Sequence, residues 1–191
     1  MTSPAAERVR EFVTAGHFDL DKVKSMLAET PALLNAAYAW SDTDHETAIM
    51  AATQTGNQAI AEYLIGQGAP VDIYTASMLA QREIVTEMLD RKPELIRARG
   101  VHGIPLLAFA SLSGDVELVQ TLVERGAVEG VSFALHNAVS RGFENIVRWL
   151  LDNAQPDLHW KNYEGKTALA VAQEQGNAIL TDLLQNHGTE E

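Results

Sequence analysis

Apolar and polar positions along this chain alternate in a way that predicts helices arriving in pairs. In the clearest copy of the pattern, an apolar run at 47–52 leads to Gly56, and a second amphipathic stretch follows at 60–65. The apolar residues of such stretches recur every three to four positions, which is typical of half-buried helices. The same order returns about every thirty residues, and a period of that size predicts a stacked solenoid.

Six copies of the pattern can be delimited, and together they occupy nearly the whole chain. Their approximate bounds are 5–38, 41–71, 72–98, 103–128, 131–157 and 164–188. One helix pair cannot bury its apolar stripe alone, so each copy depends on its neighbours. We therefore expect a single domain over residues 1–191, with the first and last copies serving as caps.

The segments that connect the copies alternate between long and short. The long ones lie at about 35–46, 98–104 and 158–165, and the short ones at 71–74 and 128–132. The helix starts that follow the long connections, Thr47, Pro105 and Thr167, are consequently about sixty residues apart, twice the period of one copy. Loops on a rigid scaffold carry recognition more often than the scaffold itself. The long connections are therefore where we expect function to lie.

The pattern resembles the ankyrin repeat, whose signature is Thr-Pro-Leu-His, two alanines, Gly-His, Ile-Val and a closing Gly-Ala. The matching segments here are Thr47-Ala48-Ile49-Met50, Ala134-Leu135-His136, Gly68-Ala69 and Gly126-Ala127. No copy is perfect, but the copies stay in register over nearly the whole chain. The resemblance implies an all-α solenoid of about six helix-turn-helix repeats with alternating long and short loops. It also implies a concave groove, laterally projecting β-hairpins, and a His136 that hydrogen-bonds backbone between repeats. The doubled layout is most similar to short, irregular bacterial arrays of this family.

Aromatic and charged residues of the connections are the candidates for binding a partner, because Trp, Tyr and Arg dominate interface energetics. The predicted partner-binding residues are Trp40, Asp42, Asp44, His45, Tyr74, Arg99, His102, His159, Trp160, Lys161 and Tyr163. The alternative for each tryptophan is that it lies flat on its own hairpin and covers the core. Trp40 and Trp160 lie at corresponding places in the first and third long connections, which favours a role in binding a partner. We therefore expect a non-enzymatic protein-interaction module that uses the concave face and the long loops.

Composition narrows the choice of partner. The formal net charge is −12 with only 14 basic residues, so a nucleic-acid or anionic-membrane surface is not expected. The partner should be a protein with a neutral to basic surface, bound by a monomer. The chain has no cysteine, no secretory signal pattern and no stretch of roughly 20 apolar residues, and we expect a cytoplasmic location.

No motif in the sequence indicates catalysis, a metal site or a cofactor. The six histidines do not form the spacing of a helical zinc site, and the glycines stand singly rather than in a phosphate-binding loop. Two alternatives to the interaction module stay open, and one of them is a purely structural or chaperone-like accessory. A small-molecule or catalytic site could form in the groove from His102, His159, Arg99 and neighbouring acidic residues.

Overall fold

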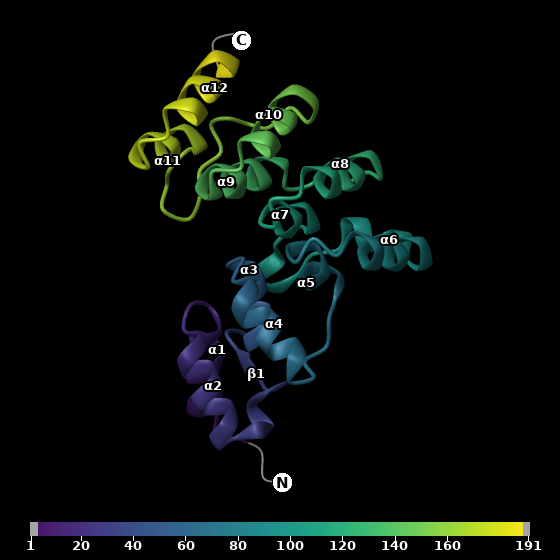
Figure 1. The fold of residues 1–191 in the computed structure, drawn as a ribbon, viewed down its shortest axis with the longest axis vertical. Helices are drawn as coiled ribbons and strands as arrows, with labels where there is room; N and C mark the ends of the chain where they lie inside the picture. Colours follow the sequence, from purple (N-terminus) through teal and green to yellow (C-terminus); the bar gives the residue numbers. More distant parts are fainter. Residues whose placement is uncertain (1–3, 189–191) are drawn as a thin grey trace.

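The computed structural model describes residues 4–188 and consists mainly of α-helices that follow one another along an elongated molecule (Figure 1). Twelve α-helices lie in these residues and form six consecutive pairs. The first helices of the pairs are α1 (Ala6–Gly16), α3 (Ala48–Gln54), α5 (Ile73–Met78), α7 (Leu106–Ser111), α9 (Val131–Arg141) and α11 (Ala168–Glu174). The second helices are α2 (Leu20–Glu29), α4 (Gln58–Gly66), α6 (Arg82–Arg91), α8 (Val116–Glu124), α10 (Glu144–Asn153) and α12 (Ala178–Gly188). This arrangement confirms the predicted all-α repeat fold.

The first helices stack on one another in chain order, and each second helix packs against the first helix of its own pair. Small residues make the close stacking possible, since the alanines that face neighbouring helices are fully buried. These alanines include Ala51, Ala52, Ala76, Ala108, Ala110, Ala134, Ala138 and Ala172. Larger apolar side chains such as Phe12, Leu64, Leu122 and Ile146 fill the space between the two rows. The buried apolar side chains form two clusters along the stack, one mainly from α1 to α5 and the other from α5 to α12.

Glycines end four of the first helices. Their φ angles are positive, at Gly56 (64°), Gly114 (79°), Gly142 (71°) and Gly176 (66°). In the third pair Ala80 takes this place with φ of 54°, a conformation that costs an L-residue about 1 kcal/mol. In the second and fourth pairs, the residue that follows the glycine caps the second helix. Asn57 Oδ1 accepts from the Ile60 amide at 3.3 Å, and Asp115 Oδ1 accepts from the Leu118 amide at 3.1 Å.

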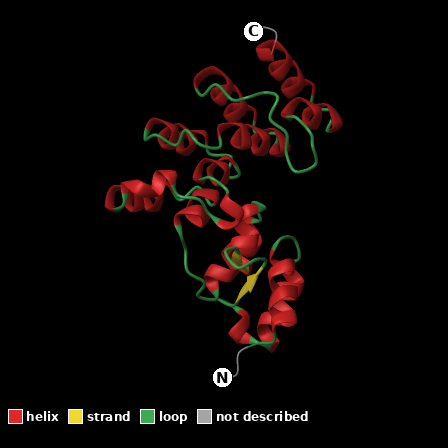
Figure 2. Ribbon diagram, turned by 180° about the vertical axis from the view of Figure 1, so that it is seen from behind, coloured by secondary structure: helices red, strands yellow, loops and turns green. Residues whose placement is uncertain are grey.

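The three longer connections adopt three different structures, and we refer to them as finger 1 (34–47), finger 2 (98–105) and finger 3 (154–167). Finger 1 follows the 3-10 helix η1 (Pro31–Leu33) and is an antiparallel hairpin of β1 (Ala37–Ala39) and β2 (His45–Thr47) (Figure 2). Finger 2 follows η2 (Pro93–Arg97), contains η3 (Val101–Gly103) and has one bridge, between Arg99 and Pro105. Finger 3 is built from turns. Within residues 4–188 the hairpin that the resemblance implies is therefore complete only in finger 1.

Over the part of the chain that the structure covers, every helix is too short or too polar to cross a bilayer.

Candidate partner-binding site

A groove with a volume of about 740 Å³ runs between α9, α11 and finger 3, on the side of the stack formed by the first helices. α9 contributes Phe133, His136, Asn137 and Ser140, α11 contributes Val171 and Glu174, and Gln175 follows α11 as its C-cap. Finger 3 contributes Trp160, Asn162, Tyr163, Glu164 and Lys166, and the opposite wall consists of Gln54, Thr55, His102 and Ile104. Fingers 2 and 3 thus meet the helices around one hollow, and its volume lies within the usual range of ligand-binding pockets.

Trp160 forms the aromatic wall of this groove together with Phe133. The two rings are stacked, with centroids 5.4 Å apart, and the His136 ring meets Trp160 edge-on at 5.3 Å. Trp160 therefore covers α9 and lines the groove at the same time.

His136 has the structural role that the resemblance implies. Its Nε2–H donates to the carbonyl oxygen of Lys166 at 2.9 Å, which fastens α9 to the end of finger 3. The carbonyl oxygen can only accept, so Nε2 carries the proton. Burial lowers the pKa of His136 below its usual value, and the hydrogen bond to Lys166 opposes this effect only in part.

The rim of the groove is charged but internally paired. Lys166 Nζ lies 2.7 Å from a carboxylate oxygen of Glu174 and 3.0 Å from one of Glu164. The ammonium of Lys166 lowers the pKa of Glu164, and both carboxylates raise the pKa of Lys166. Tyr163 stands next to this cluster with 96% of its surface exposed. A large aromatic side chain in this position is free to pack on a partner.

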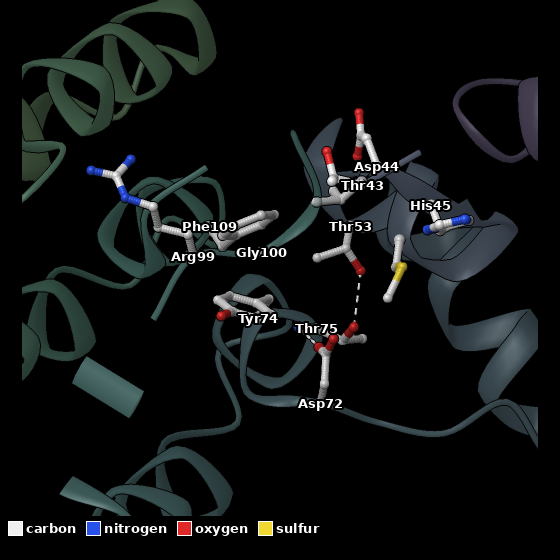
Figure 3. A pocket seen from close by; sticks show the side chains of 12 residues that line it. Thr43, Asp44, His45, Thr53, Asp72, Tyr74, Thr75, Arg99, Gly100 and Phe109 are labelled. Carbon is white, nitrogen blue, oxygen red and sulfur yellow. Dashed lines mark hydrogen bonds between the residues drawn. The ribbon is translucent and has the colours of Figure 1, made fainter. Parts of the chain in front are cut away.

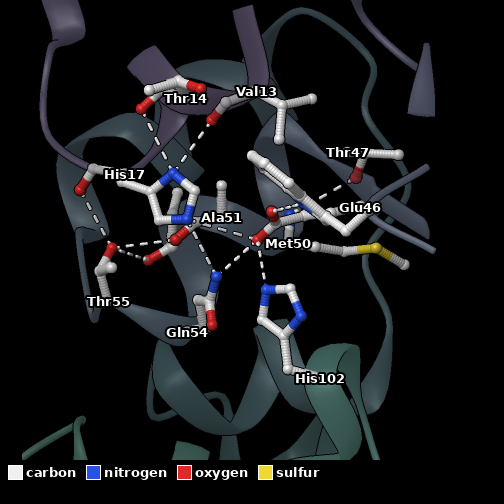
Figure 4. A network of polar contacts seen from close by, with 12 residues as sticks. Val13, Thr14, His17, Glu46, Thr47, Met50, Ala51, Gln54, Thr55 and His102 are labelled. Atoms are coloured by element: carbon white, nitrogen blue, oxygen red, sulfur yellow. Dashed lines mark hydrogen bonds and ion pairs between the residues drawn. The ribbon is translucent and has the colours of Figure 1, made fainter. Parts of the chain in front are cut away.

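A second group of polar side chains surrounds Glu46, whose exposed fraction is 0% (Figure 4). Trp40 Nε1 donates to Glu46 Oε2 at 2.7 Å, and Gln54 Nε2 donates to Oε1 at 2.5 Å. Nε2 of His17 and Nε2 of His102 lie 3.5 and 3.6 Å from the same Oε1. A buried carboxylate requires partners of this kind, because desolvation without them is costly. Trp40 is 41% exposed, yet its polar atom is committed to this network.

His17 holds its place in the network through both ring nitrogens. Its Nδ1 lies 3.1 Å from the Val13 carbonyl oxygen and 3.2 Å from that of Thr14, so Nδ1 carries a proton and donates. Its Nε2 faces the Gln54 amide nitrogen at 3.0 Å and accepts from it. The end of α1 is thereby joined to α3.

His102 joins finger 1 to finger 2. Its Nδ1–H donates to Asp44 Oδ2 at 2.5 Å, and its backbone N–H lies 3.4 Å from Asp44 Oδ1. The two residues are 58 positions apart in the sequence. Two of the predicted site residues therefore bind each other and fix the relative position of the two fingers.

The remaining predicted residues are distributed over several places. Asp42, His45, His159 and Lys161 are exposed. Tyr74 and Arg99 line a separate cavity together with Asp44 and His45. His159 borders a different hollow, beside Leu158 and Thr167, away from the one that Arg99 and His102 share. The three residues of the small-molecule alternative are thus not gathered in one cavity. No three His, Asp or Glu side chains within residues 4–188 are placed to hold a metal ion.

Sequence reasoning missed Glu46, Gln54 and His17, although one signal for Glu46 was present. In the hairpin, Tyr38 pairs with Glu46. Side chains alternate along a strand, so Tyr38, Trp40 and Glu46 share a face. Applying the period of two to 37–47 would have placed Glu46 under the aromatic residues. Gln54 and His17 carry no comparable signal, because their positions follow from helix packing.

Comparison with known proteins places this stacked array in a family. The family model described as "Ankyrin repeat" matches residues 44–76, and the one described as "Ankyrin repeats (3 copies)" matches residues 106–190. Together the two matches cover well over half of the chain, which therefore belongs to the ankyrin-repeat proteins. Members of this family are generally protein–protein interaction modules and are typically non-enzymatic.

One similar protein is Delta-latroinsectotoxin-Lt1a from Latrodectus tredecimguttatus. The two sequences are 37% identical over 81 residues, which is 39% of this chain. The aligned part is only 7% of the length of the toxin. The similarity thus concerns a short stretch of that protein.

Proposed function

We propose that this chain is a non-enzymatic protein-interaction module that holds a partner protein in the groove between α9, α11 and finger 3. The observation that carries the proposal is the combination of a groove of about 740 Å³ with the stacked Phe133–Trp160 wall and the exposed Tyr163 ring at its rim. Aromatic anchors surrounding a concave surface are the usual composition of an interaction hot spot.

The rigidity of the array supports the same proposal. Each of the six helix pairs is taken as one repeat, and each repeat is held by its neighbours before any partner arrives. Finger 3 is fastened to α9 through His136, and fingers 1 and 2 are fastened to each other through His102 and Asp44. Surfaces ordered in advance lose less conformational entropy on binding, so a modest set of contacts gives useful affinity.

The partner that suits this surface has a neutral to basic face and is bound by one copy of the chain in the cytoplasm. The net charge of −12 favours the approach of a positively charged surface over that of a negative one. The rim carboxylates near Tyr163 are already paired with Lys166, so the centre of the groove suits apolar and aromatic groups.

Site-specific photo-crosslinking in lysate of the native source tests the location of the surface. A benzophenone side chain is placed at position 163 in one variant and at position 18 in another. Phe18 is the matched control, because it is an aromatic residue with 73% of its surface exposed and lies in the turn between α1 and α2. We expect one protein to be crosslinked from position 163 and not from position 18, and excess unlabelled wild-type chain should suppress the product.

Two outcomes would contradict the proposed groove. In the first, both positions crosslink the same proteins equally well. In the second, position 18 gives products and position 163 gives none.

A further inference from the structure

A small cavity with a volume of about 240 Å³ lies between fingers 1 and 2, above the first turn of α5 (Figure 3). Finger 1 contributes Thr43, Asp44 and His45, and finger 2 contributes Arg99, Gly100 and Val101. The helices supply Met50, Thr53, Asp72, Tyr74, Thr75 and Phe109. The volume is below that of the usual pocket for a drug-sized molecule but accommodates one long side chain.

One wall of the cavity is aromatic. The rings of Tyr74 and Phe109 are tilted against each other with centroids 5.1 Å apart. Gly100 lies directly against both rings, since a Cβ at this position would be 2.9 Å from the Phe109 ring and 3.2 Å from that of Tyr74. The backbone of Gly100 therefore packs directly on both rings, and a side chain at this position would collide with them.

The charge inside the cavity is negative. Asp72 Oδ1 accepts the Thr75 amide at 2.8 Å, and among the described residues no basic side chain forms an ion pair with Asp72. The pKa of Tyr74 is raised by burial and further by the charge of Asp72, in keeping with a carboxylate close to the ring. The hydroxyls of Thr53 and Thr75 are 3.0 Å apart and bond to each other at the floor.

The one arginine on the lining is turned away from these groups. Arg99 Nη1 donates to the Gly103 carbonyl oxygen at 2.9 Å, and Nη2 donates to Glu129 at 2.6 Å. Its guanidinium points away from Tyr74 and Asp72 (Figure 3). Arg99 therefore leaves the charge of Asp72 uncompensated.

The cavity adjoins the proposed groove. Asp44 lines the cavity, His102 lines the groove, and these two residues are bonded to each other. A partner lying in the groove could reach the cavity across this pair with one extended side chain.

We propose that the cavity is an anchor site for a cationic side chain, lysine or arginine, of the partner protein. The partly exposed ring of Tyr74 attracts a cation, and the partly exposed Asp72 supplies the opposite charge. Phe109, Thr53 and Thr75 are buried and form the back of the cavity. This inference rests on the proposed function, because it concerns the same partner, and it adds one chemical requirement to it.

Binding of a small cation is the first test. N-acetylarginine methyl ester is titrated into ¹⁵N-labelled wild-type chain, with the N-acetylcitrulline ester as its neutral isostere. We expect saturable amide shifts at Tyr74, Gly100 and Val101 with the arginine ester only. Asp72→Asn should weaken this binding by about fivefold or more, because it removes the charge while asparagine still caps α5.

Asp19→Asn is the matched control, since Asp19 caps α2 in the same way by accepting from the Lys22 amide at 3.0 Å. It should bind the arginine ester as the wild type does. The anchor site would be overturned by any of three results: amide shifts that do not saturate, equal binding of the citrulline ester, or an unchanged affinity of the Asp72→Asn variant for the arginine ester.

The crosslink from position 163 then distinguishes a partner side chain from a free small cation. When the crosslinking variant at position 163 also carries Asp72→Asn, the yield of crosslinked partner should fall. When it carries Asp19→Asn instead, the yield should persist. If the arginine ester binds but Asp72→Asn crosslinks the partner at the wild-type level, the cavity does not hold the partner. A failure of the ester to bind overturns the anchor site and leaves the proposed groove intact, since Tyr163 tests the groove independently.

Discussion

At the scale of single residues, the buried carboxylate of Glu46 organises the N-terminal half of the array. Trp40, Gln54, His17 and His102 approach it from finger 1, α3, the end of α1 and finger 2. These contacts assign Trp40 a structural duty that its position in a loop does not predict. A change at Trp40 would therefore disturb stability together with any binding, which makes Tyr163 the cleaner probe of a partner.

Replacing Glu46 with alanine should lower the free energy of unfolding by about 2–4 kcal/mol, because the side-chain N–H groups of Trp40 and Gln54 lose their shared acceptor at once. Urea denaturation followed by circular dichroism measures the change. Glu62→Ala is the control, since Glu62 is exposed on α4, and its effect should stay within about 0.5 kcal/mol. A Glu46→Ala variant as stable as the control would show that the network contributes nothing.

His136 makes the stability depend on pH. Its folded pKa lies below the usual 6.5, so in the unfolded chain it takes up a proton at a higher pH than in the folded chain. The free energy of unfolding is therefore undiminished above about pH 6.5 and falls as the pH is lowered from there towards the folded pKa.

Unfolding of wild type and His136→Gln at about pH 7.5 and about pH 5 tests this effect. Glutamine can still donate to the Lys166 carbonyl but does not titrate. We expect the variant to lose less stability between the two pH values than the wild type does. An identical loss in both proteins would assign the acid sensitivity to other groups.

At the scale of elements, the sequence predicts the helices and their ends well, because these depend on local rules. The positive φ of Gly56 and the caps at Asn57 and Asp115 follow from residue type and spacing alone. The fingers are different. The bond between His102 and Asp44 joins positions 58 apart, and nothing local distinguishes a histidine that reaches another finger from one that faces solvent.

Close packing between elements is equally hidden from the sequence. Gly16, at the end of α1, leaves no room for a side chain, since a Cβ there would lie 2.7 Å from the carbonyl oxygen of Ala48 at the start of α3. The contact between the first two helices of the stack depends on this glycine.

Gly16→Ala should therefore destabilise the chain by about 1–3 kcal/mol, because the added methyl group forces α1 and α3 apart. Gly66 provides the comparison, as it is also helical and a Cβ there would meet no atom within 4 Å. Gly66→Ala should be neutral or should stabilise by about 0.5–1 kcal/mol. Thermal unfolding of both variants measures the difference, and equal stability of the two would remove the packing argument.

At the scale of the whole molecule, contacts between distant repeats support one continuous binding face. Arg141 at the end of α9 donates to the Thr55 carbonyl oxygen at the end of α3, across two intervening helix pairs. The groove draws its lining from α3, α9, α11 and two fingers, so it exists only in the assembled array. The presence of a groove could be predicted from the resemblance to ankyrin repeats. The particular residues that line the groove could not be predicted. Their positions depend on how closely the short helices α5 and α7 let their neighbours approach.

The measurement that tests the central claim most directly is the affinity of the crosslinked partner for three purified proteins: the wild type, Tyr163→Ala and Phe18→Ala. Both substitutions remove an exposed aromatic ring and should leave the fold unchanged. The account predicts that Tyr163→Ala raises the Kd by at least about tenfold, while Phe18→Ala stays within about twofold of the wild type. Binding in the groove beside finger 3 would be contradicted if Tyr163→Ala bound the partner with the same Kd as the wild type. It would also be contradicted if Phe18→Ala lost more affinity than Tyr163→Ala.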